Sequence, residues 1–443
     1  MSIISLINKI PFGNSAEKGF FLYNMLPAGL FKKMEQDNFR VTVRFVAKHS
    51  KFYQRKFSEL GIDASRVKSP GDLRDFFTTA EDIRQNPKEF ICLPPDTAYE
   101  TTGTTSKTPK RVYFSRNEVE EAGWAGAVGL WGLGVRSEDR VVSSFDYSFW
   151  VSGPVLAASC KVLGCFHVEA GRMSPAEFYE RLSDYHVTVI VGDPSWLLAL
   201  SELADKKGPL LSRKQAWPLK LLIGGGENMT EDARRYIEGV WKADLILSYG
   251  QTEAFGAIGM ESREKDGYHL NEFHNFFEIV DCDEDGYGDL VHKTLNRRVM
   301  PLLRYKSGDI TRFMKEPSPS GLSGRRIEKL KGRANEWTAT GFGNLAPWMF
   351  EPVMKEVLDL GEDWQIVVEK EGHKDMIRLQ VETGGRGDET QLKERIFSSI
   401  RSHMPQAWEL FQMDFCKLEV RVFPKGSLRQ GRKLARLVDK RKF

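Results

Sequence analysis

The chain has 443 residues, enough for about three domains, or for one large domain with a smaller companion. With 41% hydrophobic and 28% charged residues it has the composition of a globular protein, which excludes disordered, collagen-like and coiled-coil chains. No run approaches the roughly 20 apolar residues that a membrane-spanning helix needs, and Lys9 and Pro11 interrupt the amino-terminal segment. We therefore expect a cytoplasmic protein without a membrane partner.

Positive charge is concentrated at the carboxyl end of the chain. The net charge is +3, but residues 421–443 contain nine Lys or Arg and one Asp, which leaves −5 for the rest. Such a segment either attracts a polyanion or is a solvated face. Because a nucleic-acid site would interleave aromatic residues with the charge, and this segment has few, we expect no nucleic-acid partner.

The secondary-structure pattern changes along the chain. Before about residue 95 we expect helices joined by polar connections, including a long segment at residues 31–57. Further on, β-branched runs alternate with amphipathic segments in the order β-α-β-α-β. These elements are expected at residues 187–191, 195–207, 219–223, 231–241 and 245–247, after an earlier strand at 141–144. The alternation predicts an α/β domain with a parallel sheet flanked by helices.

Each of the three strands from residue 187 onward is followed by a loop of glycines and functional residue types. The loops are Gly192-Asp193-Pro194, Gly224-Gly225-Gly226-Glu227 and Ser248-Tyr249-Gly250-Gln251-Thr252-Glu253. Ligands of open parallel sheets bind at the carboxyl ends of the strands. We therefore expect a ligand site where these loops meet.

After about residue 332 the pattern is that of a small α+β unit. Strands are expected at residues 364–369, 376–382 and 417–423, and a helix at 389–403. A unit of about a hundred residues has the size of an independent domain. We therefore divide the chain into a large domain, residues 1–332, and a small carboxyl-terminal domain, residues 333–443.

The segment from Thr101 to Lys110 is the most informative for function. It contains six hydroxyl side chains, one glycine and two lysines within ten residues, a density of donors and positive charge that suits a polyphosphate. It is not a Walker A loop, because Ser106 and not glycine precedes Lys107. Taken alone, an ordinary polar loop is an equally good interpretation.

Four further motifs follow this loop in a fixed order. They are Tyr249-Gly250-Gln251-Thr252-Glu253, Arg304-Tyr305-Lys306-Ser307-Gly308-Asp309, Gly332-Arg333-Ala334-Asn335-Glu336 and the segment 429–436. In this order they resemble the adenylate-forming superfamily of acyl-CoA ligases, luciferases and peptide-synthetase adenylation domains. Segments 267–272, 300–305 and 433–439 are most similar to the phenylacetate–CoA ligase family, and the resemblance extends from Ile91 to the carboxyl terminus.

The resemblance implies an ATP site. The residues that it assigns to ATP are Thr101, Thr102, Gly103, Thr104, Thr105, Ser106 and Lys110 at the phosphates, Gly225, Gly226, Glu227, Tyr249 and Gly250 near adenine, Asp309 at the ribose, and Arg333. It also places Thr252 at the α-phosphate and Glu253 on Mg²⁺, an oxygen-seeking cation. Taken one by one, Asp309 could instead be a turn residue and Glu253 a helix N-terminal acid.

The resemblance also implies a two-step reaction. Lys433 would be the catalytic lysine between the substrate carboxylate and the α-phosphate, although alone it could equally be a surface base. A rotation of the small domain about Glu336 would then withdraw it and admit a thiol. Ser106 stands where the family usually has glycine, and Glu336 where it usually has aspartate.

The expected activity is adenylation of a carboxylic acid followed by acyl transfer to a thiol, that of coenzyme A first. A phosphopantetheine-bearing acyl carrier protein and an amine are the alternative acceptors, and a non-catalytic nucleotide-binding protein is the alternative class. Four aromatic rings within residues 145–150 favour an aryl or arylalkyl acid, with core packing as the alternative. We expect Phe149, Trp150 and Gly224 to line the acyl pocket.

Overall fold

The computed structural model describes most of the chain. The described residues are 15–25, 28–101, 109–171, 173–182, 184–207, 219–226, 229, 231–295, 297–333, 338–340, 343–371, 374–385, 388–405, 408, 411, 416–429 and 434–441. The chain divides into two compact units. The larger unit comprises Met1–Ser307 and Thr311–Lys329, and the smaller comprises Gly308–Ile310 and Leu330–Phe443.

The larger unit begins with helices, as the sequence predicted. They are α2 (Ser15–Met25), α3 (Ala28–His49), α4 (Lys51–Leu60) and α5 (Ala80–Gln85), with short 3₁₀ turns at Pro70–Leu73 and Pro87–Phe90. The break in the predicted segment 31–57 is at Ser50, whose side chain accepts a hydrogen bond from the Tyr53 backbone N–H and so starts α4. Gly61, at φ 61°, ends α4 in the left-handed conformation that glycine adopts easily.

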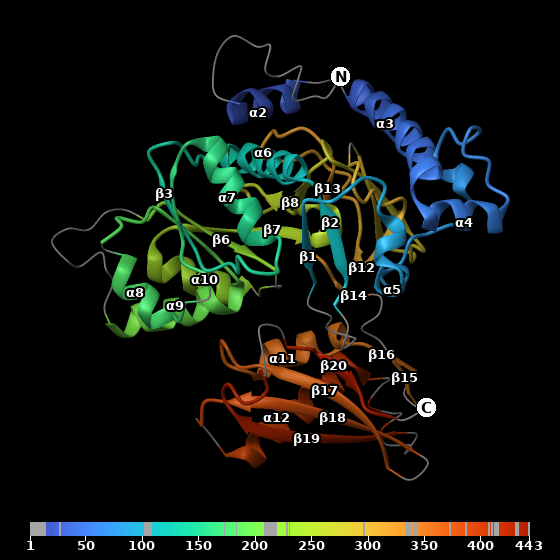
Figure 1. The fold of residues 1–443 in the computed structure, drawn as a ribbon. Helices are drawn as coiled ribbons and strands as arrows, with labels where there is room; N and C mark the ends of the chain where they lie inside the picture. Colours follow the sequence, from blue (N-terminus) through green and yellow to red (C-terminus); the bar gives the residue numbers. More distant parts are fainter. Residues whose placement is uncertain are drawn as a thin grey trace. The chain divides into compact units, whose positions relative to one another are not determined.

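An eight-stranded sheet forms the centre of the larger unit (Figure 1). Its order is β13-β9-β8-β7-β6-β5-β3-β4. The strands are β3 (Arg140–Ser143), β4 (Phe166–Glu169), β5 (Val189–Gly192), β6 (Leu221–Gly225), β7 (Asp244–Gln251), β8 (Gly256–Glu261), β9 (Tyr268–Leu270) and β13 (Arg326–Ile327). Strands β4, β3, β5, β6 and β7 are parallel, which confirms the α/β prediction, whereas β8, β9 and β13 continue the sheet antiparallel.

Helices cover both faces of the parallel part (Figure 1). They are α6 (Arg116–Gly132), α7 (Ser152–Leu163), α8 (Pro175–Leu182), α9 (Pro194–Lys207) and α10 (Glu231–Trp241). Alternate strand residues such as Val189, Val191 and Ile223 pack with Leu130 of α6 and Leu156 of α7. All four residues of β5 are buried, as expected for a strand that is covered on both faces.

Two smaller β structures complete the larger unit. A hairpin pairs β1 (Thr97–Glu100) with β2 (Arg111–Phe114), and β10 (Asn275–Val280), β11 (Gly288–Thr294) and β12 (Tyr305–Thr311) are consecutive in another sheet. Within β12, Asp309 pairs with Arg333 of β14 (Gly332–Arg333). This pairing explains why Gly308–Ile310 cluster with the smaller unit.

The smaller unit is α+β, as predicted. Its main sheet has the order β19-β18-β17-β20, with α11 and α12 packed against it. The elements are β15 (Thr338–Thr340), β16 (Gly343–Leu345), a 3₁₀ turn (Pro347–Met349), α11 (Glu351–Val357), β17 (Trp364–Glu371), β18 (Lys374–Thr383), α12 (Glu389–His403), β19 (Cys416–Pro424) and β20 (Leu437–Asp439). The predicted strands and helix each match one of these elements within two residues.

Several arginines of the basic carboxyl-terminal segment are ion-paired inside the smaller unit. Arg429 and Arg436 contact opposite oxygens of Asp363, at 3.0 and 3.2 Å. Arg441 contacts Asp375 at 3.0 Å, and its side chain is nearly fully buried. Across the part of the chain that the structure describes, no helix is both long and apolar enough to span a bilayer.

A buried ion pair ties α10 to the sheet. The Arg234 guanidinium donates two hydrogen bonds of 2.8 Å to the Glu261 carboxylate, and both side chains are almost fully buried. Arg234→Met should lower the free energy of unfolding by about 3 kcal/mol, because it removes both hydrogen bonds to the buried Glu261 carboxylate and leaves only Lys329, at 3.7 Å, as a cation beside it. Arg235→Met is the control, since Arg235 forms an exposed pair with Asp232 and should lose less than about 1 kcal/mol in urea denaturation. Equal losses in the two variants would contradict this account.

Candidate active site

The predicted glycine loop 224–227 begins inside a strand, because Gly224 and Gly225 are the last two residues of β6 and pair with β7. Gly224 pairs with Leu247 and Gly225 with Ser248. A Cβ atom on Gly224 would lie 2.9 Å from the Leu247 side chain, and one on Gly225 would lie 2.7 Å from the Ser248 hydroxyl. Packing against the neighbouring strand therefore accounts for both glycines before any ligand is considered.

The end of β7 and the start of β8 approach each other closely. A Cβ atom on Gly250 would lie 2.4 Å from the carbonyl oxygen of Gly256, so only glycine fits there. The Tyr249 ring is 7% exposed, lies 5.8 Å from the Tyr268 ring, and its hydroxyl accepts a hydrogen bond from the Gln251 amide. The predicted contact of Tyr249 with adenine stays a prediction.

Glu253 lies in the short 3₁₀ turn η4 (Thr252–Ala254) that joins β7 to β8. Its side chain is buried, with the residue 2% exposed. The Lys110 ammonium forms an ion pair with Glu253 Oε1, and the Tyr305 hydroxyl donates a 2.8 Å hydrogen bond to the same oxygen. Lys110 also donates to the Tyr305 hydroxyl, at 3.1 Å. Three segments that are distant in the sequence therefore meet at one carboxylate.

The surroundings of Glu253 keep it ionised. Burial alone would raise the pKa of this carboxyl, but the charge and hydrogen bond of Lys110, a backbone hydrogen bond and the Tyr305 hydroxyl together lower it to about 2. Glu253 is therefore a carboxylate at any physiological pH. An ionised carboxylate is the kind of ligand that a hard divalent cation prefers.

Lys110 reaches Glu253 from the base of the Thr/Ser-rich loop. The β1–β2 hairpin pairs Glu100 with Arg111, and the Thr101 N–H donates a 3.0 Å hydrogen bond to the Lys110 carbonyl. The two ends of the loop are thereby joined beside η4. The residues between them, 102–108, lie outside the described part of the chain.

Asp309 is a strand residue and not the turn residue that was its alternative interpretation. It lies in β12, is 2% exposed, and pairs across the ladder with Arg333. The structure therefore brings the backbones of these two predicted nucleotide residues together. The side chain of Arg333 is outside the described part.

The aromatic residues of the segment 145–150, which follows β3, lie in different surroundings. Phe145 belongs to the core and its ring lies 3.2 Å from the Cβ position of Gly225, while Tyr147 shares a hydrogen bond with His167. Phe149 is 63% exposed, and its carbonyl accepts a 2.8 Å hydrogen bond from the Glu100 N–H. Trp150 is half-buried. Core packing is thus the correct interpretation for Phe145, and Phe149 and Trp150 remain candidates for the pocket.

Some predicted residues cannot be placed. Those outside the described part of the chain are Thr102, Gly103, Thr104, Thr105, Ser106, Glu227, Glu336 and Lys433. Gly226, which follows β6 at φ 89°, is described, as is Thr252, which is half-buried at the start of η4.

Two residues of the site had no role in the sequence analysis. Tyr305 was part of a quoted motif, and its position four residues before Asp309 was a usable signal. No sequence pattern around Arg297 indicated a functional role for it. Its guanidinium donates a 2.7 Å hydrogen bond to the backbone carbonyl of Glu253, and burial lowers the pKa of Arg297 to about 10, so it stays charged at neutral pH.

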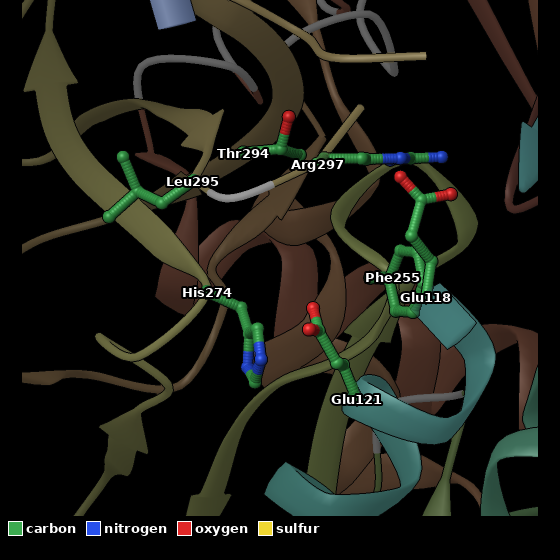
Figure 2. A pocket seen from close by; sticks show the side chains of 7 residues that line it. All are labelled: Glu118, Glu121, Phe255, His274, Thr294, Leu295 and Arg297. Carbon is green, nitrogen blue, oxygen red and sulfur yellow. The ribbon is translucent and has the colours of Figure 1, made fainter. Parts of the chain in front are cut away.

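A small cavity lies beside Arg297 (Figure 2). Its volume of about 10 Å³ is room for roughly one water molecule, which excludes it as a site for a nucleotide or an organic acid. The residues that line it are Glu118, Glu121, Phe255, His274, Thr294, Leu295 and Arg297. Burial, with the nearby Glu118, raises the pKa of Glu121, and burial lowers the pKa of His274 to about 4.

The ion pair at Glu253 should make a measurable contribution to stability. Lys110→Met should lower the free energy of unfolding by about 3–5 kcal/mol, because it leaves a buried carboxylate without its cation. Tyr305→Phe, which removes one hydrogen bond to a charged group, should lose about 1.5–3 kcal/mol. Urea denaturation at neutral pH without nucleotide or metal measures both.

The pH dependence of the free energy of unfolding of Lys110→Met gives an independent check of the ion pair. In the native protein the lowered pKa of Glu253 stabilises the fold above its ordinary value of 4.5, and this contribution is lost as the pH falls toward 2. Without Lys110, burial would raise that pKa, so protonation would stabilise the variant at low pH. The difference between native protein and Lys110→Met should therefore shrink from pH 7 to pH 4. A constant difference would contradict the charge pairing.

Comparison with known proteins identifies the family. The AMP-binding enzyme family matches residues 56–285, and the AMP-binding enzyme C-terminal domain matches residues 343–441. The phenylacetate-coenzyme A ligase of Thermus thermophilus is 27% identical over 440 residues, covering 94% of this chain and 98% of the relative. That of Aromatoleum evansii is 26% identical, covering 79% and 81%.

Solved structures agree on the fold. A 2-hydroxyisobutyryl-CoA ligase in complex with its acyl-AMP has a TM-score of 0.76 at 20% identity, covering 94% of this chain and 90% of that one. The O-succinylbenzoate coenzyme A synthetase of Bacillus subtilis, in complex with ATP and magnesium, has a TM-score of 0.54 at 17% identity, covering 77% and 69%. The chain belongs to the AMP-binding enzyme family, and within it is similar to phenylacetate–CoA ligases, as the order of its motifs indicated.

Proposed function

We propose that the protein activates an aryl or arylalkyl carboxylic acid with ATP, forming an acyl adenylate and pyrophosphate, and passes the acyl group to the thiol of coenzyme A. As an AMP-binding enzyme it is an AMP-forming ligase. The observation that carries the proposal is the buried, ionised Glu253 carboxylate held by Lys110 at the base of the Thr/Ser-rich loop. Relatives named phenylacetate-coenzyme A ligases, similar over both units, support the acid and the acceptor.

In this proposal ATP binds across the carboxyl ends of β6 and β7. The phosphates lie at the segment from Thr101 to Lys110, whose ends the hairpin joins. Thr252 contacts the α-phosphate from the start of η4, Tyr249 and the segment 224–227 lie at adenine, and Asp309 accepts hydrogen bonds from the ribose hydroxyls, with Arg333 next to it in the ladder.

Glu253 would hold the Mg²⁺ that accompanies ATP. The donor chemistry fits, because a carboxylate with a pKa of about 2 carries its charge whether or not the metal is bound. Mg²⁺ would neutralise phosphate charge when bound. The chain's own contribution is to fix this oxygen donor: Lys110 and Tyr305 occupy Oε1 and so set the orientation of the carboxylate.

Lys433 would act in the first step only. We propose the domains 1–332 and 333–443, with Glu336 as the hinge and Lys433 as the cation that stabilises the charge developing between the substrate carboxylate and the α-phosphate. For the second step the small domain rotates and withdraws the lysine, which opens the path of the thiol. We expect the protein to act in the cytoplasm.

Transfer to an acyl carrier protein or to an amine is the alternative for the second step, and a non-catalytic nucleotide-binding protein is the alternative class. ATP–pyrophosphate exchange separates an enzyme from a binding protein, because exchange requires reversible adenylate formation. Product analysis with coenzyme A, a phosphopantetheine-loaded carrier protein and free amines then identifies the acceptor.

The choice of acid is the first test. Benzoate-like and arylacetate acids should support faster exchange than straight-chain fatty acids, because ring contacts add about 0.5–1.5 kcal/mol each, or up to about ten-fold. Trp150→Ala and Phe149→Ala should reduce this preference. Phe166→Ala is the control, since Phe166 is an exposed aromatic residue at the amino end of β4. Strong turnover of a long-chain fatty acid without aryl activity would refute the assignment.

The role of Lys433 gives the second test. Lys433→Ala should slow adenylation by roughly two orders of magnitude or more, the scale for one lost charge contact in the transition state. Reaction of a preformed acyl adenylate with coenzyme A should stay within a few-fold of the native rate. Lys440→Ala, at an exposed lysine of the same segment that pairs with Glu369, is the control for both steps. Equal slowing of the two half-reactions would rule out alternation of the domains.

A further inference from the structure

Arg297 lies between β11 and β12 with its guanidinium in the interior, only 3% of the residue being exposed. One terminal nitrogen donates a 2.7 Å hydrogen bond to the backbone carbonyl of Glu253, in η4. The other reaches the carbonyl of Tyr113, in β2, at 3.4 Å. One side chain thus contacts the turn that bears Thr252 and Glu253 and also the hairpin from which the Thr/Ser-rich loop extends.

Two aromatic rings complete the surroundings of the guanidinium. It lies 4.2 Å from the centre of the Phe114 ring and 5.1 Å from that of Phe255, and Figure 2 shows it beside Phe255 and Glu118. Phe255 has a φ of 76°, a conformation that costs a non-glycine residue of the order of 1–3 kcal/mol and needs support from its surroundings. Arg297 supplies part of that support, because it donates a hydrogen bond to the Glu253 carbonyl and its guanidinium lies beside the Phe255 ring.

The hydrogen-bond partners of Arg297 are unusual for a buried arginine. Among the described residues, no carboxylate accepts a hydrogen bond from it, although buried arginines commonly pair with one. Its hydrogen bonds go to two backbone carbonyls instead, while the nearby charges of Glu118 and Glu253 favour its charged form. A guanidinium can bond two carbonyls in fixed directions, which a lysine ammonium on a flexible stem does less well.

The backbone around Arg297 is held without its side chain. The N–H groups of Arg298 and Val299 donate to the Glu118 carboxylate at 2.7 and 3.0 Å, and the Val299 carbonyl accepts from Cys92. Glu118 is itself fixed by the capping box at the start of α6. Substitution of Arg297 should therefore leave the segment in place and affect mainly the turn and the hairpin.

We propose that Arg297 is a positioning residue of the ATP site, which holds η4 against the β1–β2 hairpin so that the Glu253 carboxylate and Lys110, which follows β1 and precedes β2, keep a fixed separation. The proposal rests on the proposed function in that Glu253 is taken as the ligand of Mg²⁺. Arg297 would act through Glu253 and Lys110, since its hydrogen bonds go to the backbone of η4 and of the hairpin. Supporting residues of this kind typically change metal affinity or activity by 10–100-fold when they are replaced.

A purely structural role is the competing explanation, and Arg234 provides the matched control. Arg234 is also buried in the larger unit, but its two hydrogen bonds to Glu261 lie away from η4 and the hairpin. Arg234→Lys should lower thermal stability without any change at the metal site. Arg297→Lys keeps the positive charge and loses the fixed pair of donors. Arg297→Gln is a second variant, in case the lysine does not fold.

The experiment measures metal binding both with and without turnover. The dissociation constant of Mn²⁺ is determined by electron paramagnetic resonance in the presence of α,β-methylene ATP, which cannot form an adenylate. The Mg²⁺ concentration for half-maximal ATP–pyrophosphate exchange is measured in parallel, together with the KM for the acid and the melting temperature. Native protein, Arg297→Lys, Arg297→Gln, Arg234→Lys and Glu253→Gln are compared.

We expect both Arg297 variants to weaken Mn²⁺ binding and to raise the Mg²⁺ requirement about ten-fold or more, with the KM for the acid unchanged. Arg234→Lys should lower only the melting temperature. The proposal is overturned if the Arg297 variants behave like Arg234→Lys, or if neither of them folds. If Glu253→Gln binds Mn²⁺ like the native protein, or if no acid supports exchange, the proposed function fails instead. An unchanged Mn²⁺ affinity in Glu253→Gln removes the role of Arg297 as well, whereas weaker binding in Glu253→Gln with native binding in the Arg297 variants overturns the role of Arg297 alone.

Discussion

The candidate site depends on one buried carboxylate. Placing Glu253 in the interior costs several kcal/mol, and only a cation with further hydrogen bonds can offset that cost. Lys110 and Tyr305 supply both, from positions 143 residues before and 52 residues after it in the sequence. The hairpin, the β7–β8 turn and β12 must therefore come together before the carboxylate is stable. Folding of the larger unit and assembly of the candidate site are the same process, because the contacts that stabilise Glu253 also bring Lys110, at the base of the Thr/Ser-rich loop, to it.

A consequence is that the turn η4 is fixed from two sides. The side chain of Glu253 is oriented by Lys110 and Tyr305, and its backbone carbonyl by Arg297. The left-handed conformation of Phe255 persists only within such a set of contacts. A carboxylate held in this way loses little freedom when it binds a cation, so preorganisation of the donor is already contained in the fold. The structure thus gives a physical reason why a 3₁₀ turn of only three residues can hold a charged side chain in a fixed orientation.

Periodicity predicted most of the fold, because helices and strands are local in sequence. The alternating segments from residue 187 to 247 and the elements of the smaller unit begin and end within two residues of the prediction, except that β7 continues to Gln251 through a segment expected to be a loop. The same reasoning was weaker for single side chains. Glycines 224 and 225 were attributed to ligand approach, yet contacts with Leu247 and Ser248 already require them. Phe145 was one of the four aromatic residues that favoured an aryl acid, and it belongs to the core, in one cluster with Leu156 and Ile223. Arg297 was missed because its partners are 44 and 184 residues away, and no local pattern records such a contact.

For the basic carboxyl-terminal segment, a count of charges along the sequence misses ion-pair partners that are distant in the sequence. Counted along the sequence, residues 421–443 carry a net charge of +8 and suggest a surface for a polyanion. In the smaller unit, Arg429 and Arg436 share Asp363, and Arg441 is buried against Asp375. Asp363 and Asp375 lie 66–73 residues before these arginines, outside the window in which the charges were counted, although Arg441 also pairs with Asp439 inside it. Charges paired at 3 Å project little field beyond a Debye length of about 10 Å. The arginines therefore act first as links between the end of the chain and the sheet.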